Sequence, residues 1–146
     1  MPGFLPDTSC LVAAVAAWHP EHAAAEGEIN ARLRRGEPMM LAAAALIEAY
    51  SVLTRLPAPF RVSPGEAQRL LAGSFLDIGT TIALDGRAYR ALLDRAARDG
   101  ISGGRIYDAV IAASAERAKV DALLTFNVGH FSGLTAAGIA IVVPGR

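Results

Sequence analysis

Four polar residues of this chain stand within or next to apolar stretches, and each carries a side-chain oxygen: Asp7, Glu48, Asp108 and Asn127. Asp7 directly follows a short apolar run, and Asn127 comes shortly after another. Glu48 and Asp108 fall in line with the apolar stripes of helical segments, an unusual place for a solvated acid. Ligands of open α/β sheets bind outside the carboxyl ends of the strands, so side chains in these places can converge on one site.

Each of these residues also has an ordinary structural role open to it. Asp7 and Asp108 lie near expected helix N-termini, where a carboxylate is favourable as a cap or against the helix dipole. Glu48 could pair with Arg55, and Asn127 could cap a turn. Because buried polar groups are usually satisfied in such ways, these roles stay open for each residue taken alone.

Taken together, the three carboxylates favour a bound cation. Clustered acids without a cation would repel one another and resist ionisation. Mg²⁺ and Mn²⁺ prefer oxygen ligands and are typically held by a few carboxylates and water. The chain has one cysteine, Cys10, and no Cys–His ligand cluster, which disfavours zinc. Cys10 is expected to be a small core residue, because no partner histidine for a catalytic thiol is evident.

The composition predicts one cytoplasmic domain spanning residues 1–146. This length suffices for one core, and the 53% hydrophobic content leaves apolar surface for a partner or a second copy. No apolar run is long enough for a membrane span, and no signal peptide is expected. The net charge is zero. Lys119 is the only lysine among 14 basic residues; arginine suits phosphate binding, but genomic base composition gives the same bias.

Strand-like and helix-like segments alternate along the chain. Thr8 or Ser9 is expected to cap the first helix, and residues 126–131 are expected to form a loop. The segment 19–22 is expected to lie on the surface. The alternation predicts an α/β fold, with a parallel sheet covered on both faces. Strands are predicted up to Asp7 and at 39–42, 77–84, 122–125 and 139–143, and helices at 11–17, 21–35, 44–56, 64–75, 86–99 and 105–115.

Four blocks of the sequence, in this order, resemble those of PIN domains, and specifically those of the VapC ribonuclease toxins of bacterial toxin–antitoxin pairs. The connector at 56–64 also looks like that of the family, so the resemblance runs nearly end to end. It implies a PIN-like three-layer α/β/α fold with a central, mainly parallel sheet of about five strands. The blocks are residues 4–9, 46–55, 104–112 and 124–127 with 130–131.

The resemblance also implies an active site. By it, Asp7, Glu48 and Asp108 are the acidic ligands of Mg²⁺, for which Mn²⁺ could substitute. Asn127 falls where many relatives carry a fourth acid and others carry Asn, which leaves the choice between one and two metals open. Thr8 or Ser9 would orient Asp7 or a metal-bound water, and both are candidate substrate contacts. The implied activity is endonucleolytic cleavage of RNA of the tRNA or rRNA class, leaving 5′-phosphate and 3′-hydroxyl ends.

Substrate and partners follow from the same resemblance. An acidic site needs flanking bases to hold the RNA backbone, and the candidates are Arg55, Arg87 and Arg105, which lie near loop or motif ends. Pairing with nearby acids stays open for each of them. His130 could contact substrate or make a structural hydrogen bond. The family implies a cognate VapB-type antitoxin, and a homodimer or a toxin–antitoxin hetero-oligomer.

Two other functions stay open at this point. One is a non-catalytic PIN module whose acids bind metal or a basic partner. The other is a phosphatase with an aspartate nucleophile, which typically needs a second Asp two residues after the first. This chain has Ser9 in that position and only one lysine, so the phosphatase constellation is incomplete.

Overall fold

Five short parallel strands form the centre of the fold in the computed structural model, which describes residues 2–136 and 138–146. Three of them form one sheet in the order β1–β4–β5, and β2 pairs with β3. The parallel direction and the five predicted strands are confirmed. The strands are β1 (Phe4–Pro6), β2 (Met40–Ala42), β3 (Thr80–Ile82), β4 (Ala122–Leu124) and β5 (Ala140–Val142).

The strands do not make one continuous sheet, because β1 and β2 are linked by a single parallel bridge between Phe4 and Met39. Pro38 precedes this bridge, and its carbonyl oxygen accepts from the Phe4 N–H at 3.0 Å. Proline has no N–H to donate, so the ladder between the two strands cannot extend in that direction. Among the described residues, the predicted central sheet is divided into a three-stranded part and a two-stranded part.

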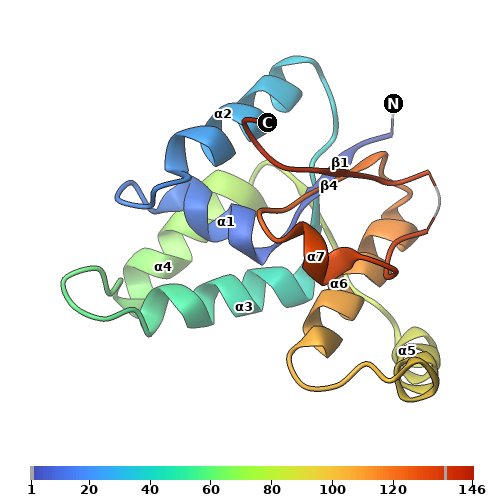
Figure 1. Cartoon of the computed structure of the whole chain (residues 1–146). Helices are drawn as coiled ribbons and strands as arrows, with labels where there is room; N and C mark the ends of the chain where they lie inside the picture. The colour runs from blue at the N-terminus through green and yellow to red at the C-terminus, as the bar shows by residue number, and fades with distance from the viewer. Residues whose placement is uncertain (1, 137) are drawn as a thin grey trace.

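Helices surround the strands (Figure 1), as the alternating pattern predicted. α1 packs against both α2 and α3, while α5 stands beside α6 away from that group. No described helix has the length and apolarity that crossing a membrane requires. The helices are α1 (Thr8–Val15), α2 (His22–Arg34), α3 (Ala43–Thr54), α4 (Pro64–Leu71), the π-helical turn η1 (Ala72–Leu76), α5 (Gly86–Asp99), α6 (Arg105–Ala118) and α7 (Val128–Phe131).

The helix starts follow local capping chemistry. The Ser63 hydroxyl accepts from the Glu66 N–H at the start of α4, and the Asp85 carboxylate accepts from the Ala88 N–H at the start of α5. The first helix was predicted to begin later and to be capped by Thr8 or Ser9, and this is wrong. Asp7 itself is the cap, because its carboxylate accepts from the Cys10 N–H.

Two other boundaries differ from the predictions. The strand predicted at 77–84 is only three residues long, because the N–H groups of Asp77, Ile78 and Gly79 bond to carbonyl oxygens of η1 instead of a neighbouring strand. The segment predicted as a loop at 126–131 contains the single helical turn α7.

Candidate active site

Asp7 lies at the carboxyl end of β1 and is almost fully buried. Its Oδ1 accepts from the Ser9 hydroxyl at 2.6 Å and from the Cys10 N–H at 3.0 Å, and its Oδ2 accepts from the Thr125 hydroxyl at 2.6 Å. Thr125 reaches it because β4 runs parallel to β1, with Leu124 in register with Pro6. Groups from one helix and the neighbouring strand thus fix this carboxylate.

The two hydroxyls that hold Asp7 are themselves oriented by the backbone. The Phe126 N–H donates to the Ser9 hydroxyl at 3.1 Å, and the Asn127 N–H donates to the Thr125 hydroxyl at 2.9 Å. Each hydroxyl oxygen therefore accepts from the chain after β4, and its own hydrogen is free to point at the carboxylate. The orientation of Asp7 is set by this relay.

Burial dominates the protonation chemistry around Asp7. Desolvation raises the pKa of Asp7 above its ordinary value, although the hydrogen bonds from Ser9, Thr125 and Cys10 act in the opposite direction. Burial, followed by the nearby Asp7 charge, raises the pKa of the Cys10 thiol far above its usual range. Cys10 is fully buried, which agrees with its predicted role as a core residue rather than a nucleophile.

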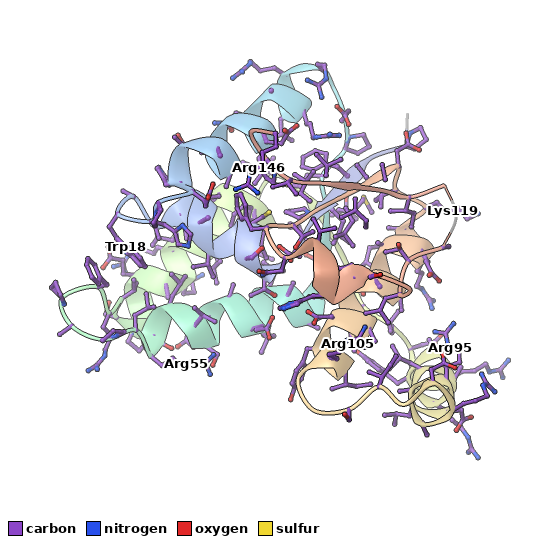
Figure 2. All side chains as sticks on the ribbon, viewed as in Figure 1. Trp18, Arg55, Arg95, Arg105, Lys119 and Arg146 are labelled. Carbon is purple, nitrogen blue, oxygen red and sulfur yellow. The ribbon has the colours of Figure 1, made fainter. Side chains whose placement is uncertain are left out.

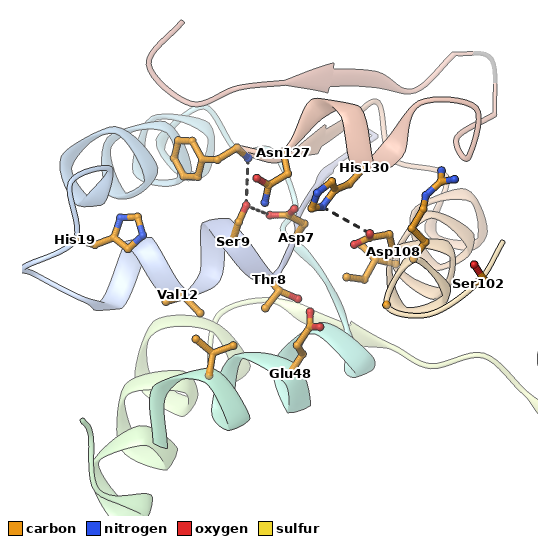
Figure 3. Close-up of a pocket in the computed structure, with 15 residues that line it drawn as sticks. Asp7, Thr8, Ser9, Val12, His19, Glu48, Ser102, Asp108, Asn127 and His130 are labelled. Carbon is orange, nitrogen blue, oxygen red and sulfur yellow. Dashed lines mark hydrogen bonds and ion pairs between the residues drawn. The ribbon is translucent and has the colours of Figure 1, made fainter. Parts of the chain in front are cut away.

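A groove of about 730 Å³ opens over Asp7, and most of the predicted site residues line it (Figure 3). They come from separate parts of the chain: the α1 start, α3, the first turn of α6 and the turn after β4. Arg87 is not among the lining residues, and Arg55 lines a neighbouring groove. The predicted residues that share the groove are Asp7, Thr8, Ser9, Glu48, Arg105, Asp108, Asn127 and His130.

Charges in this groove act on one another. Burial raises the pKa of Asp108; the next largest influence is His130, which lowers it, and Glu48 and Asp7 raise it. The His130 Nδ1 lies 3.7 Å from the Asp108 Oδ2, which makes an ion pair when the imidazole is protonated. Glu48 and Asp7 are thus close enough to oppose the ionisation of Asp108.

The donors fit a hydrated divalent cation better than a fully dehydrated one. Across residues 2–136 and 138–146, no three His, Cys, Asp or Glu side chains are arranged to hold a metal ion on their own. Both oxygens of Asp7 already accept hydrogen bonds, and Mg²⁺ usually keeps several waters beside one or two carboxylates. The Thr8 Oγ1 is buried and finds no hydrogen-bond partner within the part of the chain that the structure describes. In Figure 3, Thr8 and Glu48 point toward each other, so the groove contains a polar atom that could bind water or a ligand.

Two residues of this site were missed by the sequence interpretation. His19 was expected on the surface but lines the groove, because the turn after α1 brings it back beside Val12. Thr125 was assigned only as a strand residue, although it holds Asp7. A hydroxyl at the end of an otherwise apolar strand was the available signal for Thr125, and no comparable signal marked His19.

Comparisons with known proteins point to one family. The PIN domain family model matches residues 4–133. The curated protein Ribonuclease VapC40 of Mycobacterium tuberculosis is 42% identical over 113 residues, which cover 77% of this chain and 78% of that protein.

Two solved structures share the fold. The first is the crystal structure of Mycobacterium tuberculosis VapC20, a sarcin–ricin loop cleaving toxin, with a TM-score of 0.69 and 16% identity over 92% of this chain and 97% of that one. The second is VapBC2 from Rickettsia felis bound to a DNA fragment of its promoter, with a TM-score of 0.67 and 17% identity over 97% and 98% of the two chains.

The matched region contains all the residues that line the groove, from Asp7 to His130. The matched region therefore spans the segments that carry the acids and the hydroxyls that orient Asp7. With this match and the identity to VapC40, the chain belongs to the PIN-domain family and, within it, to the VapC ribonucleases.

Proposed function

We propose that this chain is the toxin of a VapBC toxin–antitoxin pair, and that it cuts RNA of the tRNA or rRNA class endonucleolytically with a divalent metal ion in the groove. One observation carries the proposal: Asp7, Glu48 and Asp108 come from three separate elements and line the same groove. Burial and neighbouring acids raise the pKa of Asp108. A cation in the groove removes this repulsion, which a purely structural arrangement of acids would leave in place.

Each group in the groove has a role in this proposal. Asp7, Glu48 and Asp108 hold Mg²⁺, or Mn²⁺ in its place, directly or through water. When bound, such an ion lowers the pKa of a water molecule and neutralises phosphate charge. Ser9 orients Asp7 through the 2.6 Å hydrogen bond. Asn127 offers an amide at the rim, a weaker ligand than a fourth acid.

Substrate binding needs positive charge beside the acids, because a carboxylate cluster repels the RNA backbone. Arg105 and His130 line the same groove as the acids and are the proposed phosphate contacts. Thr8 is the proposed hydrogen-bond donor to substrate or bound water, since its Oγ1 has no partner among the described residues.

Exposed apolar side chains on the surface support binding of a protein partner. Ile47 on α3 is 72% exposed and Tyr107 on α6 is 56% exposed, and both line a second groove beside the acidic one. Large exposed apolar side chains favour burial by another protein. A VapB-type antitoxin and a second copy of the chain are the proposed occupants of such surface.

The test compares cleavage of labelled structured RNAs by purified protein with and without Mg²⁺. We expect cleavage only with the metal, and a loss of about 100-fold or more in Asp7→Asn and Asp108→Asn. Asp121→Asn is the matched control, because Asp121 is an exposed acid outside the groove, and it should cleave like the wild type. Equal cleavage by all variants would indicate a contaminating nuclease. No cleavage of any RNA by the wild type would favour the non-catalytic binding module.

A further inference from the structure

His19 lines one end of the groove, and a short row of aromatic rings outside the groove lining begins at this residue. In Figure 3, His19 and Ser102 lie at opposite ends, with Asp7 and Glu48 between them. The His19 ring lies 5.6 Å from the ring of Trp18, centroid to centroid. The Trp18 ring in turn lies 4.6 Å from that of Phe60. We call these three side chains the aromatic end; His19 belongs to the groove lining, and Trp18 and Phe60 extend from it.

The rings of the aromatic end are open to solvent. Trp18 is 42% exposed and Phe60 is 43% exposed, large fractions for residues of this size. They come from the turn after α1 and from the connector between α3 and α4. Figure 2 shows Trp18 near the C-terminal end of α3 and Arg105 near its N-terminal end.

The polarity along the groove suits a single strand of nucleic acid. Arg105 offers positive charge in the groove that holds the acids, and the aromatic rings adjoin this groove at His19. Arg61, the next residue after Phe60, is exposed, and its guanidinium donates to the Leu56 carbonyl oxygen at 2.9 Å. Phosphates need the cationic groups, whereas unstacked bases need rings on which to stack.

We infer that the aromatic end is a stacking site for an unpaired nucleobase of the substrate RNA, with Trp18 as the principal platform. The inference rests on the proposed ribonuclease function and adds a selectivity element to it. A base held on Trp18 places the adjoining backbone in the groove over Asp7, so cleavage is directed to unpaired segments of the RNA. Stacking of this kind tolerates many sequences, because every base has a π face.

The experiment uses the emission of Trp18, which is the only tryptophan of the chain. The Asp7→Asn variant of the full chain is titrated with a short single-stranded RNA and with an abasic oligonucleotide of the same length. Asp7→Asn keeps the oligonucleotides intact and leaves the rings unchanged. We expect the RNA to quench the emission and the abasic oligonucleotide to leave it nearly unchanged.

Affinity for a dye-labelled RNA is then measured in variants made in the Asp7→Asn background. Trp18→Ala should bind roughly tenfold or more weakly, and Trp18→Phe should bind nearly as the parent does. Tyr89→Ala is the matched control, because Tyr89 is an exposed aromatic residue that lines the neighbouring groove, and it should bind like the parent.

Two outcomes would overturn the inference. One is equal quenching by the RNA and the abasic oligonucleotide, or affinity for RNA that does not change in Trp18→Ala. The other is emission that responds only to the cognate antitoxin, which would make the aromatic end a protein contact. Cleavage by the wild type is assayed separately. An inactive wild type would refute the ribonuclease, whereas unchanged emission with active cleavage would refute only the stacking site.

Discussion

At the scale of single residues, the hydroxyl of Thr125 links the Asp7 carboxylate to the backbone of the turn after β4. It donates to Asp7 at 2.6 Å and accepts from the Asn127 N–H at 2.9 Å. Thr125→Val keeps the shape but leaves a buried carboxylate oxygen and a backbone N–H unpaired. We expect a loss of about 1–3 kcal/mol in the free energy of unfolding, together with reduced cleavage. Thr125→Ser should stay close to the wild type in denaturant titration and in the RNA assay. A valine variant as stable and active as the serine variant would contradict this role.

The raised pKa of Asp7 predicts how the stability of the metal-free protein depends on pH. This pKa is raised above the ordinary 3.8, so the folded protein holds this proton more tightly than the unfolded chain does. The unfolded chain then loses its proton first as the pH rises, and stability falls from about pH 3.8 up through the raised pKa. Asp7→Asn removes this titration and keeps an amide oxygen as the helix cap.

The measurement is the difference in melting temperature between Asp7→Asn and the wild type, in EDTA, from about pH 4 to about pH 7. We expect the melting temperature of Asp7→Asn to increase relative to that of the wild type as the pH rises. A difference that is constant across this range would show that burial of Asp7 does not perturb its titration.

The main acids could be predicted from the sequence because each breaks a local rule. Glu48 and Asp108 interrupt apolar helical stripes, and Asp7 ends an apolar run. Thr125 and His19 break no such rule. Their roles depend on the register between β1 and β4 and on the path of the turn after α1, which are set by contacts between distant segments.

At the scale of elements, substitution of Ser63 tests how much a helix cap outside the active site contributes to the stability of the protein. The Ser63 hydroxyl accepts from the Glu66 N–H at 3.2 Å and satisfies the first turn of α4. Ser63→Ala should cost about 1 kcal/mol and lower the melting temperature by a few degrees. Ser63→Asp should retain the wild-type value. Both variants should cleave RNA normally, since Ser63 does not line the acidic groove. An alanine variant as stable as the wild type would mean that water satisfies the Glu66 N–H as well as the Ser63 hydroxyl does.

Helices were easier to predict than strands for a physical reason. α5 carries its own start and stop signals, the Asp85 cap and the left-handed Gly100, and its observed bounds equal the predicted ones. β3 has no such local signals. Its length depends on which backbone N–H groups donate to the carbonyl oxygens of η1 instead of to a neighbouring strand. Its register depends on the close approach at Gly79, where an added Cβ would lie 2.8 Å from the Met39 carbonyl oxygen.

At the scale of the whole molecule, metal binding should be visible as stability. An ion that binds only the folded chain, at about 100 times its dissociation constant, adds about 2.7 kcal/mol. Millimolar Mg²⁺ or Mn²⁺ should therefore raise the melting temperature of the wild type, and Asp108→Asn should respond less. Asp121→Asn, outside the groove, should respond fully. A wild-type melting curve indifferent to both metals would contradict a shared carboxylate site.

The tie between Asp7 and Thr125 spans 118 positions of the chain. During synthesis the first strand emerges early, yet its carboxylate has no hydroxyl from β4 to orient it until the ribosome has added Thr125. The capacity to cut RNA is thereby separated in time from most of translation. We therefore expect a growing chain to reach its full capacity for cleavage only after β4 and Thr125 have been added.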